Sequence, residues 1–173
     1  MKIIIAIIIM WMNGLFANDF SRDVNNKYQK LENKLLKIES VKGIDISKYL
    51  LKYADTQQFS NKEREHFYSK YNNQYVELPM IILVIKKIDT RLYSVIASIY
   101  ARDSGKLISV SVSATVYTKN KEESEYLEHY RTADDYPFEE QETVLLKGKF
   151  KADGGGGDLG DNLEPAIIKL PKS

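Results

Sequence analysis

The chain has 173 residues, with 25 Lys and Arg against 24 Asp and Glu, so its formal net charge is +1. This balance argues against a protein that binds nucleic acid through a broad basic surface, because such proteins carry an excess of Lys and Arg. The chain has no cysteine, which excludes a disulfide framework. We expect one domain of ordinary size, held together by its hydrophobic core.

Residues 1–17 have the three-part pattern of a secretory signal peptide. Lys2 supplies a positive charge, residues 3–12 form an uncharged apolar run, and Ala17 is a small residue at the expected cleavage point. A permanent membrane span needs about 18 apolar residues, and Asn13 ends this run too early. We therefore expect cleavage after Ala17 and a periplasmic or secreted protein without a membrane span.

Apolar spacing before Pro79 predicts three helices. Ser21 is the expected cap of the first, Gly43 follows its end, and its apolar residues recur every three or four positions. These residues are Val24, Tyr28, Leu31, Leu35 and Ile38. A short second helix is expected over Ser47–Ala54. The third should begin at a capping box of Ser60 and Glu63 and run to about Tyr71.

The pattern changes to that of strands after Pro79. Residues 80–85 are continuously apolar, as in a central strand covered on both faces. Residues 102–106 carry turn residues between two further strands, at 92–101 and 107–118. Shorter strands are expected over 143–150 and 166–170. Helices followed by strands indicate an α+β fold, with N-terminal helices packed on one face of a mostly antiparallel four- to five-stranded sheet.

In the strand at 107–118, apolar residues alternate with small uncharged ones, mostly Ser and Thr. That Ser/Thr face is either a solvated surface or one that another protein or strand covers. The domain should extend over residues 18–152. Residues 153–173 should form a Gly/Asp-rich loop and a short C-terminal strand or tail.

Residues 122–142 form an acidic stretch with nine carboxylates against one Arg, and with tyrosines between them. Paired carboxylates are the groups that hydrolyse glycosides, but nothing in the sequence fixes two of them in a cleft. The other interpretations are a solvated surface connection and a docking segment for a basic partner. The candidate partner-binding residues are Glu122, Glu123, Glu125, Tyr126, Tyr130 and Tyr136.

No motif indicates catalysis, a metal centre or a cofactor. The Gly-rich segment offers Asp153, Asp158 and Asp161 as weak calcium ligands, but glycines stand where an EF-hand loop needs ligands, so a flexible linker is the preferred interpretation. His66 and His129 are the only histidines, too few for a zinc site without carboxylate help. We therefore expect a protein that is not an enzyme.

Residues 50–115 resemble bacterial envelope domains of the curli-secretion (CsgG-like) and flagellar-assembly (FlgO-like) families. The resemblance lies in the segment 59–67, which contains Glu63-Arg64-Glu65, and in paired strands joined by the turn Asp103-Ser104-Gly105-Lys106. It implies a non-enzymatic scaffold that assembles on or near the outer membrane.

Together these patterns predict an exported envelope protein that acts by binding another envelope or secreted protein, for example as an assembly or accessory factor. Two alternatives are an inhibitor or immunity protein against a secreted toxin, and a module that binds a small apolar ligand between the helices and the sheet. An envelope hydrolase would need a histidine in hydrogen-bonding reach of a serine or carboxylate in a cleft.

Overall fold

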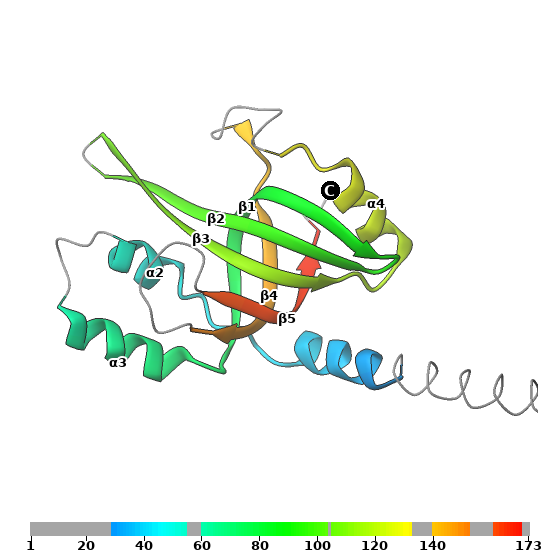
Figure 1. The fold of residues 1–173 in the computed structure, drawn as a ribbon, viewed down its shortest axis with the longest axis horizontal. Coiled ribbons are helices and arrows are strands. Elements are labelled where there is room, and N and C mark those ends of the chain that lie inside the picture. The colour runs from blue at the N-terminus through cyan, green and yellow to red at the C-terminus, as the bar shows by residue number, and fades with distance from the viewer. Residues whose placement is uncertain (1–28, 55–59, 104, 133–139, 153–160, 171–173) are drawn as a thin grey trace, which may run out of the picture. The chain divides into compact units, whose positions relative to one another are not determined.

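The computed structural model describes residues 29–54, 60–103, 105–132, 140–152 and 161–170 (Figure 1). The predicted signal peptide, Tyr136, Asp153 and Asp158 lie outside these residues. The chain divides into two units, Met1–Leu36 and Lys37–Ser173. Residues 29–36 of the first unit are helical, and all labelled helices and strands belong to the second. No helix in the described ranges is long and apolar enough to cross a membrane.

Residues 37–40 are helical, and two further helices, α2 (Ser47–Ala54) and α3 (Asn61–Tyr71), precede the strands where the sequence predicts helices. The capping box of α3 is present, with the Ser60 hydroxyl accepting from the Glu63 amide and the Glu63 carboxylate accepting from the Ser60 amide at 2.9 Å. Each group satisfies an amide that the first helical turn leaves without an intrahelical partner. The bounds of α2 match the prediction, and α3 ends at the predicted residue.

Five strands form one sheet that closes into a barrel in the order β1-β2-β3-β5-β4. The pair of β3 and β5 is parallel, and the other four pairs are antiparallel. A helix, α4 (Lys121–His129), connects β3 to β4 (Figure 1). This order, with a helix at that position, is the topology of the OB-fold, a five-stranded Greek-key barrel. The strands are β1 (Tyr75–Asp89), β2 (Leu92–Asp103), β3 (Lys106–Tyr117), β4 (Val144–Lys151) and β5 (Asn162–Lys169).

The α+β class, the helices before the strands and the mostly antiparallel sheet are confirmed. The strand β1 begins earlier than predicted and includes Pro79. In β1 the Ile82 amide points toward the β4 side, and the Glu77 amide points away from it, to the Ile44 carbonyl at 3.1 Å. Residue 79 has the same orientation as Glu77, so proline removes no hydrogen bond to β4.

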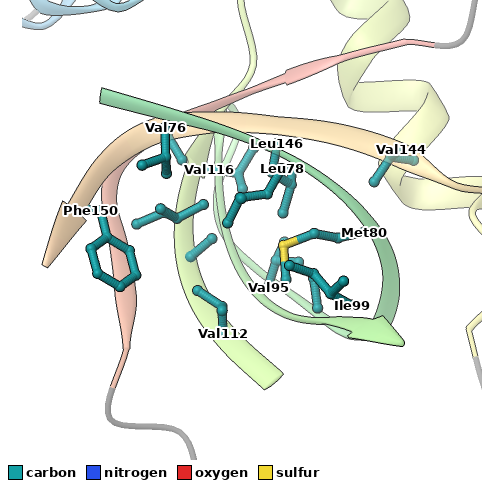
Figure 2. Close-up of a cluster of buried hydrophobic side chains, with 14 of the residues drawn as sticks. Val76, Leu78, Met80, Val95, Ile99, Val112, Val116, Val144, Leu146 and Phe150 are labelled. Atoms are coloured by element: carbon teal, nitrogen blue, oxygen red, sulfur yellow. The ribbon is translucent and has the colours of Figure 1, made fainter. Parts of the chain in front are cut away.

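The barrel interior is filled by alternating apolar side chains of all five strands. In Figure 2, Val76, Leu78 and Met80 of β1 and Val144, Leu146 and Phe150 of the neighbouring strand β4 point into the core. Residues of α2 and α3 belong to the same buried cluster, and the rings of Phe67 and Phe150 lie 6.4 Å apart, edge to face. Burying this set of side chains is the main source of stability for a chain without disulfides.

The segment before α2 is attached to the barrel at two points. Ile44 forms a parallel bridge with Val76 of β1. The ammonium of Lys147, only 3 % exposed, donates to the Glu39 carbonyl at 2.9 Å. Burial, and then the charge of Lys169, lowers the pKa of Lys147 below its ordinary value. Backbone pairing and a buried hydrogen bond thus hold residues 39–44 against the outside of β1 and β4.

Candidate partner-binding site

Part of the acidic stretch predicted from the sequence forms α4. The side chain of Asn120 accepts from the Glu123 amide at 2.9 Å and caps the helix. Glu122 and Glu123 lie in the first turn, where negative charge stabilises a helix. The local sequence therefore favours helix at residues 121–129, which periodicity alone did not reveal.

Ion pairs neutralise most of the charge on α4. Glu123 is only 4 % exposed, pairs with the Lys119 ammonium at 3.2 Å, and also accepts from the Lys119 backbone amide at 2.7 Å. The carboxylate of Glu125 pairs with Lys121 at 2.9 Å. Glu128 pairs with Lys87 of β1 at 2.6 Å. Glu122 is exposed and forms no ion pair with any described residue, so it is the carboxylate of α4 with unbalanced charge.

Tyr126 and Tyr130 lie four residues apart, so they share one side of the helical end of this segment. Their ring centroids are 5.8 Å apart. The Tyr126 hydroxyl donates to the carboxylate of Glu142 at 2.8 Å. The Tyr130 hydroxyl donates to the Glu142 carbonyl and accepts from the Ile82 amide at 3.3 Å. Both rings are thus held in place by hydrogen bonds to other parts of the chain.

The Tyr130 hydroxyl stands where β1 and β4 separate. Their pairing ends at Met80 and Val144. In the same register the next bonded pair would join Ile82 to Glu142, and the Tyr130 hydroxyl occupies the space between these two residues. We call this place the β1–β4 fork. One side chain thus satisfies the backbone groups of both strands where they diverge.

A pocket of about 330 Å³ lies beside the β1–β4 fork. Two tyrosine rings, two carboxylates and one guanidinium contribute to its wall. Its lining residues are Tyr126, His129, Tyr130, Arg131, Glu140, Gln141 and Glu142. Glu140 is exposed and forms no hydrogen bond or ion pair within the part of the chain that the structure describes. We call this site the tyrosine–carboxylate pocket.

Both phenols of the pocket remain neutral at physiological pH. Burial, and then the hydrogen bond to Glu142, raises the pKa of Tyr126 well above its ordinary value. Burial also raises the pKa of Tyr130. A neutral tyrosine ring has a negative π face that attracts cations, and carboxylates add charge-assisted hydrogen bonds. The chemistry of this pocket therefore suits a cationic group such as an ammonium or guanidinium.

The structure places the residues predicted from sequence in different positions. Tyr126 and Tyr130 line the pocket together, whereas Glu122, Glu123 and Glu125 lie on α4 outside its lining. The carbonyl of Asp161 accepts from the Ser113 amide, and no group of three or more His, Asp or Glu in the described ranges could hold a metal ion. No local signal in the sequence marks Glu140, Gln141 and Glu142 as site residues, because only tertiary structure brings them to Tyr126.

A second cleft of about 390 Å³ lies between α2 and the pair of β1 and β2. None of its described lining residues is charged. The hydroxyl of Ser47 donates to Asp45, and that of Ser98 donates to the Val110 carbonyl. These hydroxyls are already used within the protein, so the tyrosine–carboxylate pocket is the stronger candidate site.

Comparison with protein-family models, curated proteins and solved structures finds no match for this chain. The fold is an OB-fold barrel, and residues at the end of α4 line part of the tyrosine–carboxylate pocket.

Proposed function

We propose that this protein is a non-enzymatic binding protein that takes a basic side chain of another protein into the tyrosine–carboxylate pocket. The observation that carries the proposal is the pocket of about 330 Å³, in which the rings of Tyr126 and Tyr130 lie beside the carboxylates of Glu140 and Glu142. Export of the protein to the periplasm or beyond stays a prediction from residues 1–17. The envelope-assembly role implied by the resemblance over residues 50–115 also stays a prediction.

The fixed position of the two rings favours binding. Hydrogen bonds from both hydroxyls to Glu142 immobilise the phenols before a ligand arrives. A preorganised site loses less conformational entropy on binding than a mobile one. A lysine or arginine side chain can then lie on a ring face with its charge near Glu140.

The surroundings of the pocket favour a protein segment over a small free cation. Glu122 and Glu140 are exposed carboxylates without an ion pair among the described residues, and both belong to the acidic stretch. Negative charge around a binding site accelerates encounter with a positively charged surface and disfavours acidic partners.

Calorimetric titration of the full mature chain with two peptides tests the proposal. The first peptide has three arginines separated by glycine and serine, and the second has citrulline, which is uncharged and nearly isosteric, in place of arginine. We expect the arginine peptide to bind and the citrulline peptide not to bind. Equal binding of both peptides, or binding of neither, contradicts the proposal.

A matched pair of variants locates the binding. The variant Glu140→Gln removes a carboxylate from the pocket wall, and Glu122→Gln makes the same change on α4 outside it. We expect Glu140→Gln to weaken binding of the arginine peptide about threefold to fivefold, the size of an exposed ion pair, and Glu122→Gln to have less effect. The reverse order would place the binding site elsewhere on the acidic surface.

A further inference from the structure

The second half of β1 has one side without a partner strand. Residues Ile81–Asp89 pair with β2, but the pairing of β1 with β4 ends at Met80. In the described part of the chain no other strand pairs with Leu83–Asp89. A strand directs alternate amide and carbonyl groups to its two sides, so a strand with one neighbour presents a row of backbone groups on the other side.

This edge begins at the β1–β4 fork. The Ile82 amide points to the side that β4 has left and is satisfied by the Tyr130 hydroxyl. Beyond Ile82, no backbone hydrogen bond outside the sheet involves the described residues of this segment. An added strand at Leu83–Asp89 would therefore continue the path that β4 follows up to Val144.

Along this edge, two exposed apolar side chains flank one positively charged side chain. Val84 is 48 % exposed and Ile88 is 56 % exposed. Lys86 lies between them, is exposed, and has no ion-pair partner within the residues described. Val84 and Lys86 are on the same face of the strand, and Ile88 follows at an irregularity in the register. Exposed β-branched residues on an unpaired edge are a surface on which another strand can pair.

A second copy of this chain is the wrong occupant. Antiparallel self-pairing centred on Lys86 would place the two ammoniums directly opposite each other. A shift of one residue would place Lys86 opposite Lys87 of the other copy. Like charges directly opposite destabilise a strand pair, and lysine on an edge is a known protection against self-association. The charge therefore selects a different chain with a carboxylate opposite Lys86.

We propose that an extended segment of a partner protein, with an acidic residue between two apolar ones on the same face of the segment, adds to β1 along Leu83–Asp89 as a further strand. Backbone hydrogen bonds to the edge give the affinity, and contacts with Val84, Lys86 and Ile88 give the specificity. This surface is separate from the tyrosine–carboxylate pocket, which takes a basic group, so the inference goes beyond the proposed function and does not depend on it.

Fluorescence anisotropy of a labelled eight-residue peptide with valine, glutamate and valine on one face and threonine at the other positions, titrated with the full mature chain, tests this proposal. We call it the valine–glutamate peptide. We expect binding, together with slower amide hydrogen exchange at Leu83–Asp89. The same peptide with lysine in place of glutamate, the valine–lysine peptide, should bind more weakly. A valine–glutamate peptide with proline at its centre should lose binding, because proline has no amide to donate to the edge.

A charge-reversal variant makes the test specific. Lys86→Glu should weaken binding of the valine–glutamate peptide about fivefold and strengthen binding of the valine–lysine peptide, because cross-strand charge pairs contribute modestly and with either sign. Lys62→Glu, the same change at an exposed position on α3, should leave both affinities unchanged. The proposal is overturned if the valine–glutamate peptide does not bind, or if it protects amides outside Leu83–Asp89. It is also overturned if Lys86→Glu leaves the affinity for this peptide unchanged. These results are independent of the arginine-peptide titration, so either proposal can fail alone.

Discussion

The two halves of β1 have similar apolar sequences and opposite environments. In Tyr75–Met80 the strand lies between β4 on one side and Ile44 on the other, and alternate side chains are fully buried. In Ile81–Asp89 it pairs with β2, and exposure increases from Ile82, which is buried, to Ile88. To close the five-stranded barrel, β1 pairs with β4 along its first half and with β2 along its second half. Both proposed binding surfaces lie where this change of neighbour occurs.

The largest difference between the halves should appear when a core side chain is truncated. Leu78 is fully buried in the first half, so Leu78→Ala should lower the free energy of unfolding by about 2–5 kcal/mol through lost burial and a cavity. Val84→Ala in the second half should cost less than about 1 kcal/mol, because that side chain is half-exposed. Urea denaturation measures both values. Similar losses for the two variants would show that the halves do not differ in packing.

A glycine opposite the first half should be almost as sensitive. Gly148 pairs with Val76, and a Cβ atom there would lie 2.8 Å from the Pro165 carbonyl oxygen and 2.9 Å from the Cβ of Ala166. We expect Gly148→Ala to destabilise the protein by about 1–3 kcal/mol, because the tightly packed barrel must move to admit a methyl group. Thermal unfolding measures the loss. Ser109→Ala, at an exposed position of β3, is the control that should leave the melting temperature nearly unchanged.

A smaller effect is expected at the β1–β4 fork. Tyr130→Phe keeps the ring and removes the hydroxyl that joins the Ile82 amide to the Glu142 carbonyl. The cost should be about 1 kcal/mol or slightly more, because both backbone groups lose a partner. Tyr117→Phe is the matched control, since Tyr117 forms no hydrogen bond through its hydroxyl within the described residues. If the two variants unfold at the same urea concentration, the Tyr130 hydroxyl does not stabilise the fork.

The sequence predicts the parts of this fold that depend on local signals. The capping box of Ser60 and Glu63, the turn between β2 and β3 and the alternation in β3 are all confirmed, because each depends on residues near one another in the chain. Closure of the barrel was not predicted. It depends on β1 pairing with β4 and on β3 pairing in parallel with β5, and apolar periodicity does not specify which strands are neighbours.

The same limit applies to the candidate site. Tyr126 and Tyr130 could be named from the sequence, because aromatic residues within an acidic stretch stand out. Their contacts with Glu142 and Ile82 could not, because they require the separation of β1 from β4. The sequence also predicted β1 to be covered on both faces along residues 80–85. In the structure Val84 is 48 % exposed, because it lies opposite Ile96 on the outer face of the strand pair, away from the face that carries the buried Val95 and Ala97.

The smallest effect, and one restricted to acid pH, is expected in the second half of β1. The Lys87 ammonium, and then the Tyr93 hydroxyl, hydrogen-bond to Glu128 and hold the pKa of its carboxyl below the ordinary value of 4.5. A carboxyl with a lowered pKa in the folded state stabilises the fold above pH 4.5, and this contribution is lost as the pH falls through the folded-state pKa.

Urea denaturation at a series of pH values therefore separates the wild-type protein from Glu128→Gln. The wild type should lose more stability than the variant as the pH falls below 4.5, whereas the difference at neutral pH should be small and decrease with added salt, because the pair is exposed. The variant should keep the part of the acid sensitivity that comes from Glu63, whose pKa is lowered by hydrogen bonds from Ser60. Identical pH profiles would mean that the ion pair between Lys87 and Glu128 contributes nothing to the free energy of unfolding. The Tyr130 hydroxyl would then be the main polar link between this half of β1 and the segment that carries the pocket.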